Sequence, residues 1–142
     1  GYWAIATGCH ENSTAIGAGE STFGAGLLEA AVLAHAESRG VLLCVYDVPA
    51  SGPLRDVIAC HSRFAAALVL APWTPRAVAR AKLRVDDAAA TLAPVPPLLH
   101  ASHAGNPAAA SLPLLAMLAR REPGALRIVA APSLHLHLEI SF

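Results

Sequence analysis

The sequence has no excess of charge of either sign. Ten basic and ten acidic residues among 142 give a formal net charge of zero, and charged residues make up only 14% of the chain. A nucleic-acid-binding surface or a polybasic membrane patch needs a cationic excess, so the composition supports neither. The chain is also 55% hydrophobic, which excludes intrinsic disorder and favours one domain with a real core.

Cysteine is scarce and has no motif spacing. The three cysteines, Cys9, Cys44 and Cys60, are an odd number and contain no C-x-x-C pair. We therefore expect neither a disulfide framework nor a cysteine metal site, and a reducing compartment, the cytoplasm, fits best. Each cysteine is interpreted as a small buried apolar residue, and Cys44 most clearly so because it lies inside an apolar run.

Long hydrophobic runs and a signal peptide are absent as well. The longest uncharged stretch, residues 88–119, is interrupted by five prolines, whereas a spanning helix needs about 20 apolar residues. The chain begins at Gly1 and its only methionine is Met117. We expect a fragment that lacks an earlier N-terminal portion, with part of its apolar surface facing a missing segment or a partner.

Helix and strand signals alternate along the chain. Apolar residues at three- and four-residue steps predict a helix over about 21–38, with Ser21 and Thr22 as caps and Gly40 beyond its end. A second helix is expected from 107 or 111 to about 121, with Leu114, Leu115 and Leu118 buried. Strands buried on both faces are predicted at Val41–Tyr46 and Phe64–Leu70. At Arg76–Val85 we expect an edge strand with one solvent-exposed face, and a helix is the alternative there. Further strands are predicted at Leu126–Ala131 and Leu134–Phe142. Residues 94–107 are interpreted as an irregular connector, and the whole pattern indicates a layered α/β domain.

The segment from Gly17 to Phe23 resembles two known motifs incompletely. The dinucleotide fingerprint needs a third glycine where Thr22 stands, and a P-loop needs a lysine where Glu20 stands. The nucleophile elbow G-x-S-x-G would make Ser21 an esterase nucleophile, but Phe23 replaces its second glycine. We favour Ser21 as a helix cap over Ser21 as a nucleophile.

The histidines give only weak evidence for a functional site. His135, His137 and Glu139 alternate along one strand and share a face, which is a weak candidate for a metal site. An amphipathic edge strand produces the same pattern, and we favour that interpretation. His100 and His103 lie in a polar loop and are expected to be solvated.

Five segments together resemble the β-ketoacyl-synthase-like N-terminal domain family, relatives of ketosynthases and chain-length factors of fatty-acid-like and aryl-polyene pathways. The segments are Tyr2–Gly8, Ser13–Ile16, Gly19–Ala31, Val41–Asp47 and Phe64–Leu70, and the first and third are the most specific. The resemblance implies a thiolase-like α/β fold, a layered half-domain with a mixed sheet and a buried central helix. It covers most of the chain and weakens through residues 76–107.

The resemblance also implies where the chemistry of an active ketosynthase would lie. The nucleophilic cysteine of such an enzyme stands at the turn into the central helix, whose N-terminus favours the thiolate. In this chain Glu20 occupies that position, followed by Ser21, Thr22 and Phe23. An acidic or amide residue there marks the non-condensing chain-length factors, so no catalytic residue is expected in this chain.

Three functions stay open from the sequence. The first is a non-condensing, chain-length-factor-like partner of a ketosynthase; the second is an active synthase that uses residues outside this fragment; the third is an unrelated hydrolase or binding domain using Ser21. The expected partner is a ketosynthase subunit or a second copy of this chain. The basic row of Arg80, Lys82 and Arg84 has two interpretations: it binds an acyl-carrier protein, or it is a solvated strand face. No cofactor, nucleic acid or membrane is expected.

Overall fold

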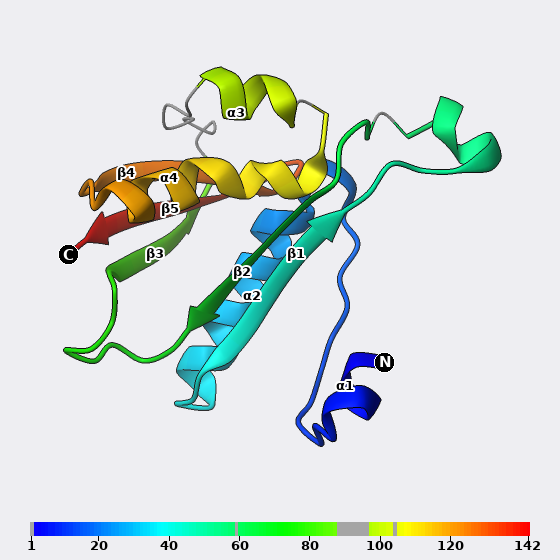
Figure 1. The fold of residues 1–142 in the computed structure, drawn as a ribbon. Coiled ribbons are helices and arrows are strands. Elements are labelled where there is room, and N and C mark those ends of the chain that lie inside the picture. The colour runs from blue at the N-terminus through cyan, green and yellow to red at the C-terminus, as the bar shows by residue number, and fades with distance from the viewer. Residues whose placement is uncertain (1, 59, 88–96, 104) are drawn as a thin grey trace.

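The computed structural model describes residues 2–58, 60–87, 97–103 and 105–142 (Figure 1). Residues 94–96 and 104 of the predicted connector lie outside this range, as does residue 59. The helices are α1 (Tyr2–Thr7), α2 (Thr22–Ala36), α3 (Pro97–Ser102) and α4 (Leu112–Arg120), with 3₁₀ turns η1 (Gly19–Ser21), η2 (Gly52–Asp56) and η3 (Pro107–Ser111). The strands are β1 (Val41–Asp47), β2 (Phe64–Leu70), β3 (Arg80–Asp86), β4 (Gly124–Ala131) and β5 (Leu134–Ser141).

Helix α2 is the buried centre of the fold and confirms the helix predicted over 21–38. Phe23, Leu27, Ala30 and Ala34 lie on one stripe and are each at most 4% exposed. The helix packs against β1 on one side and β4 on the other, so it contacts both sheets (Figure 1). Its end differs from the prediction, because Ser38 rather than Gly40 takes the left-handed conformation, with φ of 51°.

The segment before α2 is held to the far end of that helix by charge. Arg39, just beyond the helix, pairs with Glu37 and with Glu11 in the extended segment that follows α1. The hydrogen bond that Arg39 donates to Glu11 raises the pKa of the Arg39 guanidinium above its ordinary value, and the charge of Glu37 acts in the same direction. Helix α1 itself stands clear of the two sheets in Figure 1.

Strands β1 and β2 form a two-stranded antiparallel sheet in which Cys44 faces Ala67. The positions of both strands were predicted correctly, but burial on both faces was wrong. Val45 points toward α2 and is buried, whereas Cys44 and its neighbours on the other face are exposed. The reason is that the sheet packs against α2 and η3 with one face buried, while alternate side chains on the other face are exposed.

Strands β3, β5 and β4 form the second sheet, antiparallel throughout and in that order. Leu136, Leu138 and Ile140 of β5 face the core and are at most 4% exposed. The edge strand predicted near Arg80 is confirmed as β3, and the helical alternative is excluded. Strand β5, however, is the central strand, so the prediction that it is an edge strand was wrong.

The segment between the sheets is more regular than predicted. Helix α3 forms inside the stretch interpreted as an irregular connector. The predicted second helix is confirmed as η3 followed by α4. Leu114, Leu115 and Leu118 were predicted to be buried. Leu114 is buried, whereas Leu115 and Leu118 are only half-buried, and Met117 is buried although it was not predicted to be.

The layered α/β fold with a buried central helix is therefore confirmed. A sheet of mixed strand direction was expected from the resemblance, whereas the ladders of the described residues are all antiparallel. Within the described residues no helix has the length and apolar character needed to cross a bilayer. The prediction of a single domain over residues 1–142 stays a prediction.

Candidate functional site

The turn that leads into α2 is built around one threonine. The hydroxyl of Thr22 donates to the carbonyl oxygen of Gly19 at 2.7 Å and accepts from the backbone N–H of Ala18 at 2.9 Å. Gly19 takes a positive φ of 56°, a conformation that glycine adopts without strain. The turn is thus closed by a side chain at the start of the helix that follows it.

Glu20 lies at the middle of this turn, next to the N-terminus of α2. Its side chain is exposed and has no hydrogen-bond or ion-pair partner among the residues that the structure describes. The unpaired N–H groups of the first helical turn give this end of α2 a partial positive charge, which favours a carboxylate nearby. The position predicted for a nucleophile is therefore an accessible one, and it holds an acid.

The two residues that follow Thr22 hold the start of α2 against the core. Phe23 is 1% exposed and anchors the helix in the core. A Cβ built on Gly24 would lie 2.0 Å from the carbonyl oxygen of Val129, at the irregularity in β4 between Val129 and Ala131. The sequence interpretation noted that Phe23 replaces the glycine of an elbow motif but missed that Gly24 supplies the close approach one position later.

Replacing Thr22 by valine is expected to lower the free energy of unfolding by about 1 kcal/mol. Valine keeps the shape of the side chain but removes both hydrogen bonds of the hydroxyl to Ala18 and Gly19. Thr22→Ser keeps the hydroxyl and serves as the control. Urea denaturation measures both variants, and equal stability of the two would show that the turn does not depend on this hydroxyl.

Ser21 occupies the N-cap position, but its side chain makes no capping hydrogen bond. The prediction that the Ser21 side chain caps the helix was therefore wrong. The hydroxyl of Thr22 bonds the backbone of the turn instead. Ser21 is half-buried, and no described histidine or carboxylate is bonded to its hydroxyl. The described residues thus provide no base to activate Ser21 as a nucleophile.

The three thiols lie on other elements. Cys9 follows α1 and is half-buried, and Cys44 is exposed on the outer face of β1. The prediction that Cys44 is buried was wrong, for the reason given above for its sheet. Cys60 is 3% exposed and its Sγ donates to the backbone carbonyl of Ser62 at 3.3 Å.

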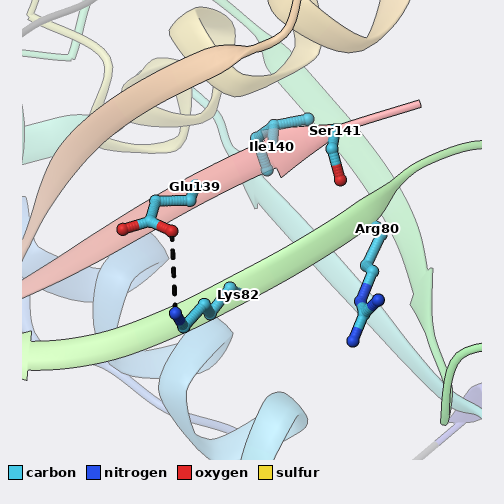
Figure 2. Close-up of a pocket in the computed structure, with 5 residues that line it drawn as sticks. All are labelled: Arg80, Lys82, Glu139, Ile140 and Ser141. Carbon is cyan, nitrogen blue, oxygen red and sulfur yellow. Dashed lines mark ion pairs between the residues drawn. The ribbon is translucent and has the colours of Figure 1, made fainter.

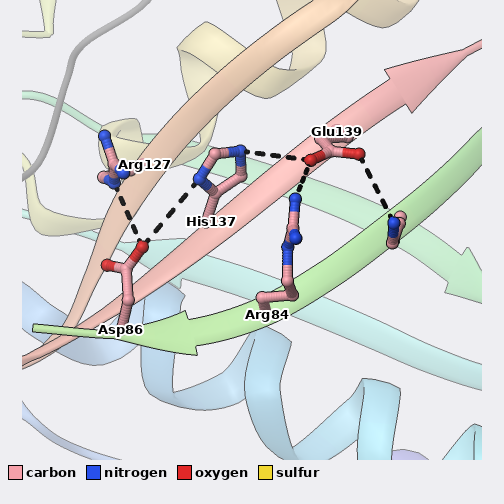
Figure 3. Close-up of polar contacts among 6 residues, drawn as sticks. Arg84, Asp86, Arg127, His137 and Glu139 are labelled. Carbon is pink, nitrogen blue, oxygen red and sulfur yellow. Dashed lines mark hydrogen bonds and ion pairs between the residues drawn. The ribbon is translucent and has the colours of Figure 1, made fainter. Parts of the chain in front are cut away.

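The outer face of the second sheet carries an alternating row of charges (Figure 3). His137 lies between Asp86 (3.9 Å) and Glu139 (3.7 Å), and Arg127 donates to Asp86 at 3.3 Å. Arg84 pairs with Glu139 from the neighbouring strand. Among the described residues no group of three histidine, cysteine or acidic side chains has an arrangement that could hold a metal ion.

The basic row predicted to meet a carrier protein is partly neutralised. Lys82 lies 3.9 Å from Glu139, which also pairs with Arg84. Arg80 instead packs over the ring of Trp73, at 5.6 Å from its centroid. A shallow pocket of about 200 Å³ lies between β3 and β5, lined by Arg80, Lys82, Glu139, Ile140 and Ser141 (Figure 2).

His103 is not the solvated residue that the sequence suggested. It is half-buried, and its ring lies edge-on to Phe64 with centroids 4.9 Å apart. Its Nδ1 atom is 3.4 Å from the hydroxyl of Ser62, a residue that the sequence interpretation did not single out. Because 41 positions separate the two residues and no motif links them, only the fold reveals this contact.

Comparison with known proteins gives one match. A family model described as β-ketoacyl synthase, N-terminal domain, matches residues 1–122, which contain η1, α2, β1 to β3 and α4. No curated protein and no solved structure matches the chain. The matched region includes Glu20 and the whole turn before α2. The chain therefore belongs to the β-ketoacyl synthase N-terminal domain family.

Proposed function

We propose that this protein is a non-condensing, chain-length-factor-like partner of an active ketosynthase in fatty-acid, polyketide or aryl-polyene synthesis. The observation that carries the proposal is the carboxylate of Glu20, exposed in the turn before the buried helix α2. In a ketosynthase-like domain this is the position from which a thiolate would attack. Membership in the β-ketoacyl synthase N-terminal domain family supports a ketosynthase-related role. The assignment of Glu20 to the nucleophile position rests on the resemblance of the segment around it.

The chemistry of the condensation argues against Glu20 as a substitute nucleophile. Claisen condensation proceeds through an acyl group held as a thioester, which needs a nucleophile that attacks a thioester and later leaves. A carboxylate is a weak nucleophile toward a thioester and would form a mixed anhydride. Cys9, Cys44 and Cys60 lie on other elements and do not replace it.

The outer face of the first sheet supports the existence of a protein partner. Its large side chains Leu42, Tyr46 and Val69 are 53%, 75% and 72% exposed. The pairing of β1 with β2 sets small residues between them: Cys44, Ala65 and Ala67. A flat, uncharged face of this kind is typical of a surface that another protein or segment covers. We propose that the ketosynthase subunit covers it.

Val69→Lys is expected to weaken binding to the ketosynthase by at least about tenfold, because burying an unpaired ammonium group costs several kcal/mol. The measurement is titration of a purified ketosynthase against this chain, with each protein expressed and purified separately. Val78→Lys is the matched control, since Val78 is 67% exposed and lies outside both sheets. Equal affinities of the Val69 variant and the control would remove this face from the interface.

A further inference from the structure

A compact cluster of polar side chains surrounds Ser62, between η2 and β2. The amide nitrogen of Asn106 donates to the Ser62 carbonyl at 2.8 Å and reaches the Ser62 hydroxyl at 3.5 Å. The Sγ atom of Cys60 donates to the same carbonyl at 3.3 Å. Asn106 and Cys60 are 5% and 3% exposed, so the groups that hold Ser62 are themselves fixed in the core.

The hydroxyl of Ser62 faces a base. Nδ1 of His103 lies 3.4 Å from Ser62 Oγ, within the looser range seen for nucleophile–base pairs without substrate. The edge-on contact with Phe64 holds the imidazole ring in place. Because Asn106 donates toward Oγ, the hydroxyl proton is free to point at Nδ1 of the neutral imidazole. Ser62 and His103 are both half-buried, so this pair is not sealed from solvent.

We propose that Ser62 and His103 form a nucleophile–base pair that takes acyl groups from thioesters and activated esters. The Ser62 Oγ bonds to the acyl carbonyl carbon while its proton passes to Nδ1 of His103. The bond from that carbon to the leaving sulfur or oxygen breaks, and the leaving group takes the proton from His103. Water then attacks the Ser62 ester, gives a proton to His103 and releases the carboxylic acid, and Ser62 regains its proton.

The pair differs from the Ser21 hypothesis in what surrounds the hydroxyl. Ser62 has an imidazole and an amide at its oxygen, whereas Ser21 has neither among the described residues. This activity goes beyond the proposed partner function and is independent of Glu20. It produces a free acid and no carbon–carbon bond, so its presence or absence is read separately from condensation.

The test uses the full chain with a biotinylated fluorophosphonate, which labels activated serines, and with 4-nitrophenyl acetate as substrate. Peptide mass spectrometry is expected to find the phosphonyl group on Ser62. Ser62→Ala abolishes labelling and 4-nitrophenolate release but leaves the fold intact, because Asn106 Nδ2 and Cys60 Sγ still bond the backbone carbonyl. His103→Gln slows both by roughly 100-fold, the contribution of a general base. Ser21→Ala is the control and leaves both rates unchanged.

The pH profile separates a base from a structural role for His103. The labelling rate of the wild-type chain is expected to rise with pH, and His103→Gln is expected to remove that rise. The proposal is overturned if no serine is labelled, if the label lies on Ser21 or elsewhere, or if His103→Gln labels at the wild-type rate. Circular dichroism of each variant shows that the comparison is made between folded chains.

Discussion

Gly24→Ala is expected to lower the free energy of unfolding by about 3 kcal/mol, the upper range for overpacking a core. The added Cβ would lie 2.0 Å from the carbonyl oxygen of Val129, 2.7 Å from its carbonyl carbon and 2.9 Å from Cα of Ala130. All three are backbone atoms of β4, so no side-chain rotation relieves the clash. The helix propensity of alanine returns only about 1 kcal/mol of this loss.

Gly26→Ala is the matched control in the same helix. Its Cβ would meet only Cδ1 of Leu43 at 3.2 Å, the end of a side chain that can move by a few tenths of an ångström. Since alanine also favours the helix, the net change is expected to stay within about 1 kcal/mol. Thermal and urea unfolding give both values. Equal stability of the two variants would mean that α2 does not approach β4 as closely as the structure shows.

The elements with a strong local pattern were predictable from the sequence. Helix α2 follows from its apolar stripe, and β1 and β2 follow from continuous apolar runs between turn residues. Their surroundings were not predictable, because an apolar run does not say how many of its faces are covered. Cys44 was therefore expected to be buried and is exposed. The central place of β5 was missed for a similar reason, since strand order depends on long-range pairing.

The candidate sites also differ in how far they could be predicted from the sequence. Glu20 could be located at the start of a helix because capping residues and the apolar stripe mark that boundary. The contact between Ser62 and His103 joins residues from two loops, and neither loop carries a motif. Ser21 and Thr22 were both expected to cap the helix, but Ser21 makes no capping bond and the Thr22 hydroxyl bonds Ala18 and Gly19 of the turn. Residue type did not reveal this difference, because both residues suit such positions. For the candidate sites, the contact that the sequence did not show therefore lies in loops.

The second large effect concerns condensation. Removing an essential nucleophile lowers the rate of covalent catalysis on the order of a million-fold. If Glu20 stands in the place of that nucleophile, the chain alone forms no β-ketoacyl product above the buffer control. Glu20→Gln is expected to behave in the same way, because the carboxylate takes no part in bond formation. A ketosynthase added to the wild-type chain restores product and supplies the positive control.

The most direct measurement supplies the purified full chain with an acyl thioester and a malonyl-carrier substrate and follows carbon–carbon bond formation by mass spectrometry. The account predicts that the wild-type chain alone yields no β-ketoacyl thioester, whatever acid it releases through Ser62. Appearance of that product without a second subunit would contradict the account, because it would show that a condensing site exists in a chain with an acid at position 20.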